Sequence, residues 1–378
     1  MIIFVFTKLK NNTKLLFAIR YSELLHMKNL SYLSLKIYCR IALKFYFKKW
    51  QVRNIQPVPE GAVIFVANHQ NAFLDAVVLG CSSHHNPWFL TRANVFQKPL
   101  MKKIFNTFKM TPVYRFRDGF STLRKNDEVI DNCVQLLTRG EAIVVFGEGN
   151  HDEHWRLRPL QKGFARIALA AEEKNKWTLG VKIIPVGIQY DSHSEFRSRV
   201  LVSFGQSISV KDTIQQNTSL QEQQELLVNK TSEALKSLML HIEQPDYEKK
   251  VGYFLKNRII KKDLATQLKS DQYIISTTPQ LPEAEPAKSI THKNEPWWNP
   301  IFLYEYVNHL LPWAVIRWVL KTKVKDPQFI GSLKFALGIV VVPIFYVLQT
   351  SLCYAISGSL VVSGIYLLSL PVSILLKQ

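Results

Sequence analysis

Short apolar runs alternate with longer stretches of helical periodicity between Pro57 and about residue 246. The runs are rich in β-branched and aromatic residues and are too short for helices, so they predict strands. The alternation predicts an α/β domain over residues 53–246, with a mostly parallel sheet covered by helices. The expected strands are 62–67, 88–93, 141–146, 181–188 and 199–204, and the expected helices are 74–81, 98–108, 121–138, 160–174 and 220–243.

The C-terminal part of the chain has a different pattern. No charged side chain occurs from Phe335 to Leu376, and this length is enough for two membrane spans of about 20 residues each. We therefore predict a transmembrane helical hairpin; a pair of core helices or a re-entrant hairpin is the alternative. Lysines on both sides predict that the ends of the hairpin, and with them the α/β domain, lie on the cytoplasmic face. These lysines are Lys321, Lys323, Lys325, Lys334 and Lys377.

The N-terminal residues 1–52 are assigned to amphipathic, membrane-associated helices. Apolar residues recur at helical spacing among cationic side chains, which is typical of a helix in a membrane interface. An amphipathic helix packed on the domain is the alternative. The initial MIIFVF is followed at once by lysines and has no small-residue cleavage site, so a secretory signal is not expected. The coherent pattern begins at Met27, which is consistent with an overextended start over residues 1–26. The apolar positions are Leu30, Leu33, Ile37, Ile41 and Phe45.

Two segments follow the α/β domain. Residues 247–296 are predicted to be a basic helical arm that ends in a proline-rich linker, since residues 277–296 have little apolar content. Residues 297–378 begin with WWNP and are predicted to be an aromatic interfacial segment followed by the two hydrophobic membrane helices.

The charge of the chain narrows the choice of partners. Lys plus Arg number 48 against 29 Asp plus Glu, so the formal net charge is +19. This excess favours anionic partners, and no nucleic-acid recognition motif accompanies it. We expect a lipid bilayer and phosphorylated substrates, and no nucleic acid. The four cysteines have neither disulfide nor zinc spacing, and the pair His151 and His154 is more typical of a solvated loop, so no metal site is predicted.

Polar residues of catalytic type follow two predicted strands. His69 comes after the strand 62–67, and Glu148 comes after the strand 141–146. Because ligand sites in parallel sheets lie at the carboxyl ends of strands, we expect both to share one rim. Asp75 is six positions beyond His69, which is about 600° on a regular helix and so a different face. A turn must intervene, with Asp75 early in a helix whose N-terminal N–H groups would be open to an oxyanion or phosphate.

Four segments in order resemble the motif blocks of the glycerolipid acyltransferases, the family of lysophosphatidic acid and glycerol-3-phosphate acyltransferases. They are NHQNAFLD (68–75), TPVYR (111–115), FGEG (146–149) and IIPVGI (183–188), and the resemblance covers roughly residues 50–210. It implies a glycerol-3-phosphate acyltransferase-like fold. Two departures occur. Five residues, rather than the usual four, separate His69 from Asp75, and Gly147 and Asn150 replace the proline and threonine of the usual FPEGT block.

The resemblance implies transfer of a fatty acyl group to a hydroxyl of glycerol 3-phosphate or a lysophospholipid such as 1-acylglycerol 3-phosphate. The donor is acyl-CoA or acyl carrier protein, and no other cofactor is expected. An imidazole suits removal of the hydroxyl proton, and a carboxylate stabilises the imidazolium. The predicted roles are His69 as general base, Asp75 as its partner, Arg115 as phosphate ligand, Glu148 and Gly149 as acceptor-binding residues, and Asn68 and Pro185 as supports of the motifs.

Two other functions remain open. A non-catalytic protein that binds membrane lipids or polyanions would use the same basic surface. A hydrolase of acyl thioesters would use the same histidine, although no GxSxG nucleophile elbow is present in the sequence.

Overall fold

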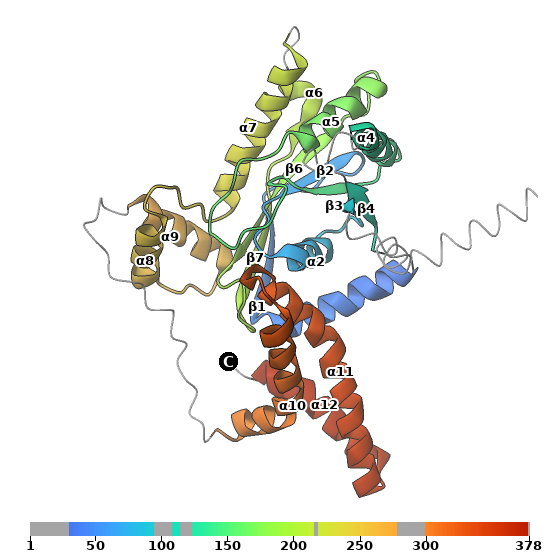
Figure 1. The fold of residues 1–378 in the computed structure, drawn as a ribbon, viewed down its shortest axis with the longest axis vertical. Helices are drawn as coiled ribbons and strands as arrows, with labels where there is room; N and C mark the ends of the chain where they lie inside the picture. The colour runs from blue at the N-terminus through green and yellow to red at the C-terminus, as the bar shows by residue number, and fades with distance from the viewer. Residues whose placement is uncertain (1–29, 94–107, 114–122, 215–217, 278–298, 377–378) are drawn as a thin grey trace, which may run out of the picture.

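A twisted sheet forms the centre of the molecule in the computed structural model, which describes residues 30–93, 108–113, 123–214, 218–277 and 299–376 (Figure 1). The strand order is β1-β7-β6-β2-β5-β3-β4, with β8 beside β6. β7 and β8 run antiparallel to β6, and the other described pairings are parallel. The strands are β1 (Lys49–Asn54), β2 (Val63–Ala67), β3 (Trp88–Arg92), β4 (Met110–Val113), β5 (Ile143–Phe146), β6 (Lys182–Tyr190), β7 (Arg199–Phe204) and β8 (Ile208–Ser209).

The predicted α/β class with a mostly parallel sheet is therefore confirmed. Each of the five expected strands is present with its ends shifted by at most two residues. Three strands were not predicted. Of these, β1 has the sequence KWQVRN, whose polar residues mask the strand pattern because it lies at the edge of the sheet and pairs with β7. The sheet thus extends to the N-terminal side of the predicted boundary at residue 53.

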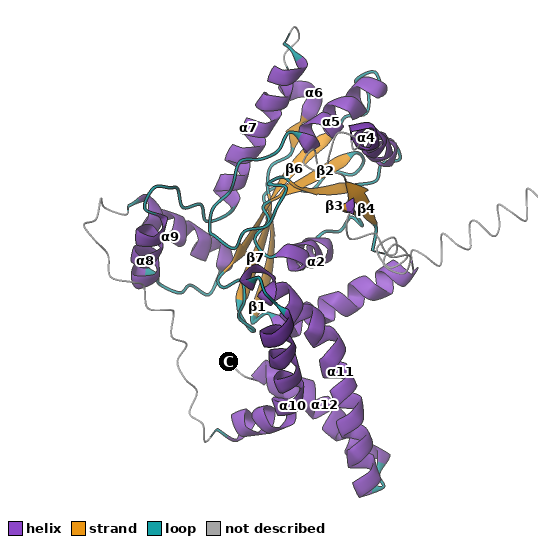
Figure 2. Ribbon diagram, viewed as in Figure 1, coloured by secondary structure: helices purple, strands orange, loops and turns teal. Residues whose placement is uncertain are grey.

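Helices cover both faces of the sheet (Figure 2). Most lie close to their predicted positions, but α7 ends earlier than expected, and residues 98–107 of one predicted helix lie outside the described residues. In addition to a helix over residues 30–46, the helices are α2 (Ala72–Ser82), α4 (Leu123–Thr138), α5 (Gly163–Lys174), α6 (Val210–Thr213), α7 (Leu220–Leu238), α8 (Tyr247–Asn257), α9 (Leu264–Ser276), α10 (Pro300–Lys323), α11 (Ile330–Ser357) and α12 (Leu360–Leu376).

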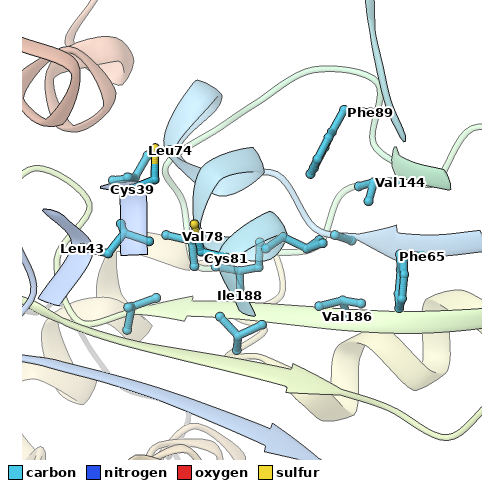
Figure 3. Close-up of a cluster of buried hydrophobic side chains, with 14 of the residues drawn as sticks. Cys39, Leu43, Phe65, Leu74, Val78, Cys81, Phe89, Val144, Val186 and Ile188 are labelled. Atoms are coloured by element: carbon cyan, nitrogen blue, oxygen red, sulfur yellow. The ribbon is translucent and has the colours of Figure 1, made fainter. Parts of the chain in front are cut away.

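Strand β2 joins two hydrophobic cores through the alternation of its side chains. Phe65 and its neighbours at odd positions belong to one hydrophobic cluster with side chains of α2 and of the helix of residues 30–46. Figure 3 shows part of this cluster, with Phe65, Val78 of α2 and Leu43 of that helix labelled. Ile64 and Val66 pack on the opposite face with α4, α5 and α7. All five residues of β2 are inaccessible to solvent, and each large aliphatic side chain so buried contributes about 1.5–3 kcal/mol. The end of β2 is consequently a fixed point from which the following loop projects.

The segment predicted as a basic arm is packed on the sheet. α8 and α9 bury Phe254 and Leu268 against Leu201 of β7. The guanidinium of Arg258 binds Asp271 at 2.7 Å and Asp191 at 2.6 Å. The predicted helices are present, but their apolar residues form a third core on the sheet and do not leave them as a separate arm. The predicted linker falls mainly on residues 278–298, outside the described residues.

The C-terminal helices α10, α11 and α12 pack on one another and extend away from the sheet (Figure 1). The helical segment Pro327–Ser357, which includes α11, is long and apolar enough to cross a membrane. α12 has 17 residues and follows a turn at Gly358, where φ is 62°. A membrane hairpin stays a prediction.

The helix of residues 30–46 has two apolar faces. Tyr32, Cys39 and Leu43 are buried on the domain. The stripe Leu30, Leu33, Ile37 and Ile41, identified in the sequence, is about half exposed or more. The alternative of packing on the domain thus holds for one face, while the other face stays available for a membrane.

Candidate active site

His69 and Glu148 lie together at the rim of the sheet, as the sequence predicts. β2 and β5 are parallel neighbours, so the residues that follow them emerge at the same edge. The backbone N–H of His69 donates to Oε1 of Glu148 at 2.8 Å. The carboxylate therefore fixes the backbone of the loop that carries the imidazole.

Asp75 holds the ring of His69 from the other side. Nδ1 of His69 lies 2.9 Å from Oδ2 of Asp75, with the side chain of Asp75 fully buried and that of His69 17% exposed. The same oxygen accepts the backbone N–H groups of Gln70 and Asn71 at 2.8 and 2.7 Å. Because the carboxylate accepts from three donors at one oxygen, it is held in one orientation.

The predicted turn between His69 and Asp75 is present and strained. Ala72, the first residue of α2, has φ of 38°, in a region that costs a residue with a side chain about 1 kcal/mol or more. This turn brings Asp75 back beneath His69. The expectation of open N–H groups at the N-terminus of α2 was wrong for those of Gln70 and Asn71, which bind Asp75, and for that of Leu74, which binds Ser332.

Aromatic groups surround the imidazole. The ring of His69 stacks on Phe146 with centroids 4.1 Å apart and an interplanar angle of 15°. His151 approaches at 5.6 Å, edge to face. Burial lowers the pKa of His151, and the neighbouring His69 acts in the same direction. The prediction of a solvated loop was wrong for His151, which is half-buried beside the site.

Glu148 forms an ion pair that the sequence analysis did not single out. Its Oε2 accepts from Nε of Arg158 at 2.8 Å, and its side chain is only 1% exposed. Burial raises the pKa of the Glu148 carboxyl, and the hydrogen bonds from Arg158 and His69 oppose that rise. Both oxygens of Glu148 are thus engaged by protein groups, which favours positioning of the loop; contact with an acceptor stays a prediction.

The remaining predicted site residues each have a position of their own. Asn68 is fully buried and ties the loop to β6, because its amide donates to the carbonyl of Ile188 at 2.9 Å and accepts its N–H at 2.7 Å. Gly149 has φ of 72°, which favours glycine. Pro185 lies within β6, paired in register with Val66 of β2. Arg115 lies outside the described residues.

Comparisons with known proteins show what this part of the chain is similar to. Residues 49–189 match the family model described as Acyltransferase. This part of the chain is similar to the acyltransferase family. The matched residues include His69, Asp75 and Glu148, so the rim of the sheet lies within the matched region.

Two relatives of this chain are glycerolipid acyltransferases by name. One is glycerol-3-phosphate O-acyltransferase 1 of Saccharomyces cerevisiae, 33% identical over 95 residues, which are 24% of this chain and 12% of the yeast protein. Another is 1-acyl-sn-glycerol-3-phosphate acyltransferase BAT2, chloroplastic, of Brassica napus, 24% identical over 153 residues, or 40% of each chain. The matched part of this chain spans less than half the length of either relative. A solved structure, the 1-acyl-sn-glycerophosphate acyltransferase PlsC of Thermotoga maritima, is similar at a TM-score of 0.40 and 18% identity over 55% of this chain and 81% of that one.

Three residues near the candidate active site were not predicted from the sequence. Tyr190 donates to Oδ1 of Asp75 at 2.8 Å, but the predicted strand ended two residues before it. Arg158 lies in LRPLQKGF, a segment noted for its resemblance but not for this arginine. Ser332 is far away in the sequence, and no local pattern connects it with the site. Among the described residues, no group of three or more His, Cys, Asp or Glu side chains is arranged to hold a metal ion.

Proposed function

We propose that the protein is a membrane-bound O-acyltransferase that moves a fatty acyl group from acyl-CoA or acyl carrier protein to a hydroxyl of glycerol 3-phosphate or 1-acylglycerol 3-phosphate. The observation that carries this proposal is the contact of 2.9 Å between His69 and Asp75 at the rim of the sheet. Asp75 occupies Nδ1, which leaves Nε2 to accept a proton from a substrate. The family match supports acyl transfer as the reaction.

The reaction uses the imidazole twice. His69 removes the proton of the acceptor hydroxyl while its oxygen attacks the thioester carbonyl carbon and a C–O bond forms. Asp75 stabilises the resulting imidazolium without taking the proton itself. The C–S bond then breaks, and the imidazolium returns its proton to the departing thiolate. No covalent intermediate with the enzyme is required.

An apolar groove runs along the helix that carries Asp75 and suits an acyl chain. The groove lies between α2, the helix of residues 30–46 and strands β3 and β4. Its lining includes Phe73, Val77 and Gly80 of α2, the helix that also carries Asp75. An apolar groove matches a fatty acyl chain in chemistry, and we assign the acyl chain of the donor to it.

Two features support the proposed membrane association. The exposed stripe on the helix of residues 30–46 and the apolar segment Pro327–Ser357 both present hydrophobic side chains to the surroundings. The hydroxyl of Tyr38 donates to the carbonyl of Ile339, so the two elements lie side by side. We propose that the bilayer receives both, with the catalytic domain on the cytoplasmic face. The net charge of +19 favours anionic headgroups and the phosphate of the acceptor, with Arg115 as a proposed phosphate ligand.

Mass spectrometry of products tests this function. Purified protein in vesicles receives one acyl-CoA, or the matching acyl carrier protein thioester, together with each of glycerol 3-phosphate, 1-acylglycerol 3-phosphate and an amino-acid lipid as acceptor. We expect a new ester on one of the two phosphorylated acceptors. Release of free fatty acid that is independent of acceptor would instead identify a hydrolase. Vesicle binding without turnover on any acceptor would identify a lipid-binding protein.

A further inference from the structure

The N-terminus of α2 lacks a cap from its own chain neighbours. Asn71 occupies the capping position, but its side chain does not bond to the helix. Its amide donates instead to the carbonyl of His193 at 2.7 Å. A capping side chain normally satisfies one of the first N–H groups of a helix. The backbone carbonyl of Asn71 accepts the N–H of Leu74 at 2.9 Å, so a side-chain cap for the active-site helix can come only from another segment.

Ser332 of α11 supplies that cap. Its Oγ accepts the N–H of Leu74, in the first turn of α2, at 3.0 Å, and the carbonyl of Asn71 shares that N–H at 2.9 Å. The same Oγ donates to the carbonyl of Asn71 at 2.6 Å. The hydroxyl therefore bridges the last residue of the turn and the third residue of α2. Ser332 is 2% exposed, so water cannot readily replace it. Ser332 lies far outside residues 49–189, which match the acyltransferase model.

The residues around Ser332 hold α11 tightly against the site. A Cβ placed on Gly331 would lie 2.1 Å from the carbonyl oxygen of His193, so glycine permits this close approach. The hydroxyl of Tyr46 donates to the carbonyl of Gly331 at 3.1 Å. Phe335 is 1% exposed and packs edge to face on Tyr46 at 5.3 Å. The start of the apolar helix is consequently fixed to the domain on both sides of Ser332.

We infer that Ser332 is a positioning residue for acyl transfer, through which the C-terminal apolar helix holds the active-site turn in its reactive shape. The turn contains the strained Ala72, and Asp75 follows it by three residues. Strain of this kind persists only where the surroundings fix it. The inference rests on the proposed function. It assigns to a segment outside the matched domain a part in aligning Asp75 with His69.

Five variants test the inference: Ser332→Ala, Ser332→Cys, the control Ser373→Ala, Asp75→Asn, and Ser332→Ala combined with Asp75→Asn. Ser373 is also buried in an apolar helix, but its Oγ donates within α12 to the carbonyl of Leu370 at 2.7 Å. Hydrogen–deuterium exchange of full-length protein in detergent measures protection of residues 69–78. For Ser332→Ala we expect exchange about fivefold faster, the factor for a lost cap worth about 1 kcal/mol. Ser332→Cys should be intermediate, and Ser373→Ala should match the wild type.

Kinetics supply the second measurement. For Ser332→Ala we expect kcat to fall about ten- to a hundredfold, as for a small misplacement of catalytic groups, with KM for both substrates within about twofold. If Ser332 acts through Asp75, the same substitution in an Asp75→Asn background should change kcat by less than about twofold.

The outcomes separate the two proposals. Unchanged exchange in Ser332→Ala, or an equal loss of kcat in both backgrounds, would overturn the role of Ser332. Absence of transfer by the wild type on every acceptor would refute the proposed function, while the exchange data would still decide whether Ser332 caps α2. If Ser332→Ala fails to fold, Ser332→Cys answers the same question, because wild-type protection in that variant would contradict the inference.

Discussion

The hydroxyl of Tyr190 donates to Oδ1 of Asp75 at 2.8 Å, and both side chains are fully buried. The other carboxylate oxygen of Asp75, Oδ2, is hydrogen-bonded to Nδ1 of His69. Tyr190 is the last residue of β6, whereas Asp75 lies in the first turn of α2. The sheet therefore holds the carboxylate from behind while the carboxylate holds the imidazole, and the reactive geometry depends on the central strands as well as on the loop.

Replacing Tyr190 tests this arrangement. Tyr190→Phe leaves Oδ1 of Asp75 buried without its donor, which costs about 1–3 kcal/mol in stability. We expect kcat to fall about tenfold, or about 1.4 kcal/mol in the activation barrier, with KM little changed. Steady-state kinetics measure this effect. Tyr273→Phe is the control, because Tyr273 is 69% exposed on α9; an equal loss in both variants would contradict the role of Tyr190.

The pH dependence of stability should report His193. Burial lowers the pKa of this imidazole to about 4 from its usual 6.5, and its Nε2 lies 3.1 Å from Oε1 of Gln70. The unfolded chain therefore binds a proton below pH 6.5 that the folded chain does not bind until about pH 4. Stability from this group is present above pH 6.5 and is lost as the pH falls toward 4, by up to about 1.4 kcal/mol per pH unit.

The variant His193→Gln removes that titration. Unfolding by urea in detergent micelles, followed from pH 7 to pH 4, should show a shallower decline in the free energy of unfolding for the variant than for the wild type. Parallel declines would show that His193 does not contribute.

Gly149 should be sensitive to a side chain. Its φ of 72° favours glycine, and an added Cβ would lie 3.3 Å from Cγ of Gln161. Gly149→Ala is expected to lower the free energy of unfolding by about 1–2 kcal/mol. Gly163→Ala is the matched control, since nothing lies within 4 Å of its Cβ position and it begins α5. Thermal melting of both variants measures the difference, and an equal melting temperature would contradict the prediction.

The exposed stripe of the N-terminal helix should lie in lipid. A nitroxide label on a cysteine at position 37, where Ile37 is 50% exposed, should be more accessible to O2 than to a water-soluble nickel chelate in reconstituted vesicles. Ile259, 63% exposed between α8 and α9, gives the control position. Labels are placed on a Cys353→Ala background. Equal accessibilities at positions 37 and 259 would refute a membrane-facing stripe.

The sequence predicts what depends on local patterns. The alternation of apolar runs gives the main strands of the sheet, and the position of His69 and Glu148 after two of them gives their shared rim. The six-residue interval gives the turn before Asp75. These predictions succeed because strand periodicity and the geometry of parallel sheets depend on nearby residues.

Contacts between segments that are far apart in the sequence cannot be predicted from local patterns. Ser332 caps α2 from a helix that reads only as apolar, and the serine is one of several in that region. β1 was not predicted because its polar residues, which an edge strand can expose to solvent, interrupt the apolar pattern of a strand. α8 and α9 were read as an arm because their basic surface dominates the composition, although Phe254 is fully buried. In each case the decisive partner is far away in the chain.

The most direct test of the account is the rate of acyl transfer after removal of the imidazole. The assay uses the full chain in vesicles with radiolabelled acyl thioester, and His69→Ala should lower kcat by about 10²–10⁴-fold. The control His84→Ala changes an exposed histidine that precedes β3, and it should retain the wild-type rate. Transfer by His69→Ala at the wild-type rate would contradict the central claim that this ring accepts the proton of the acceptor hydroxyl.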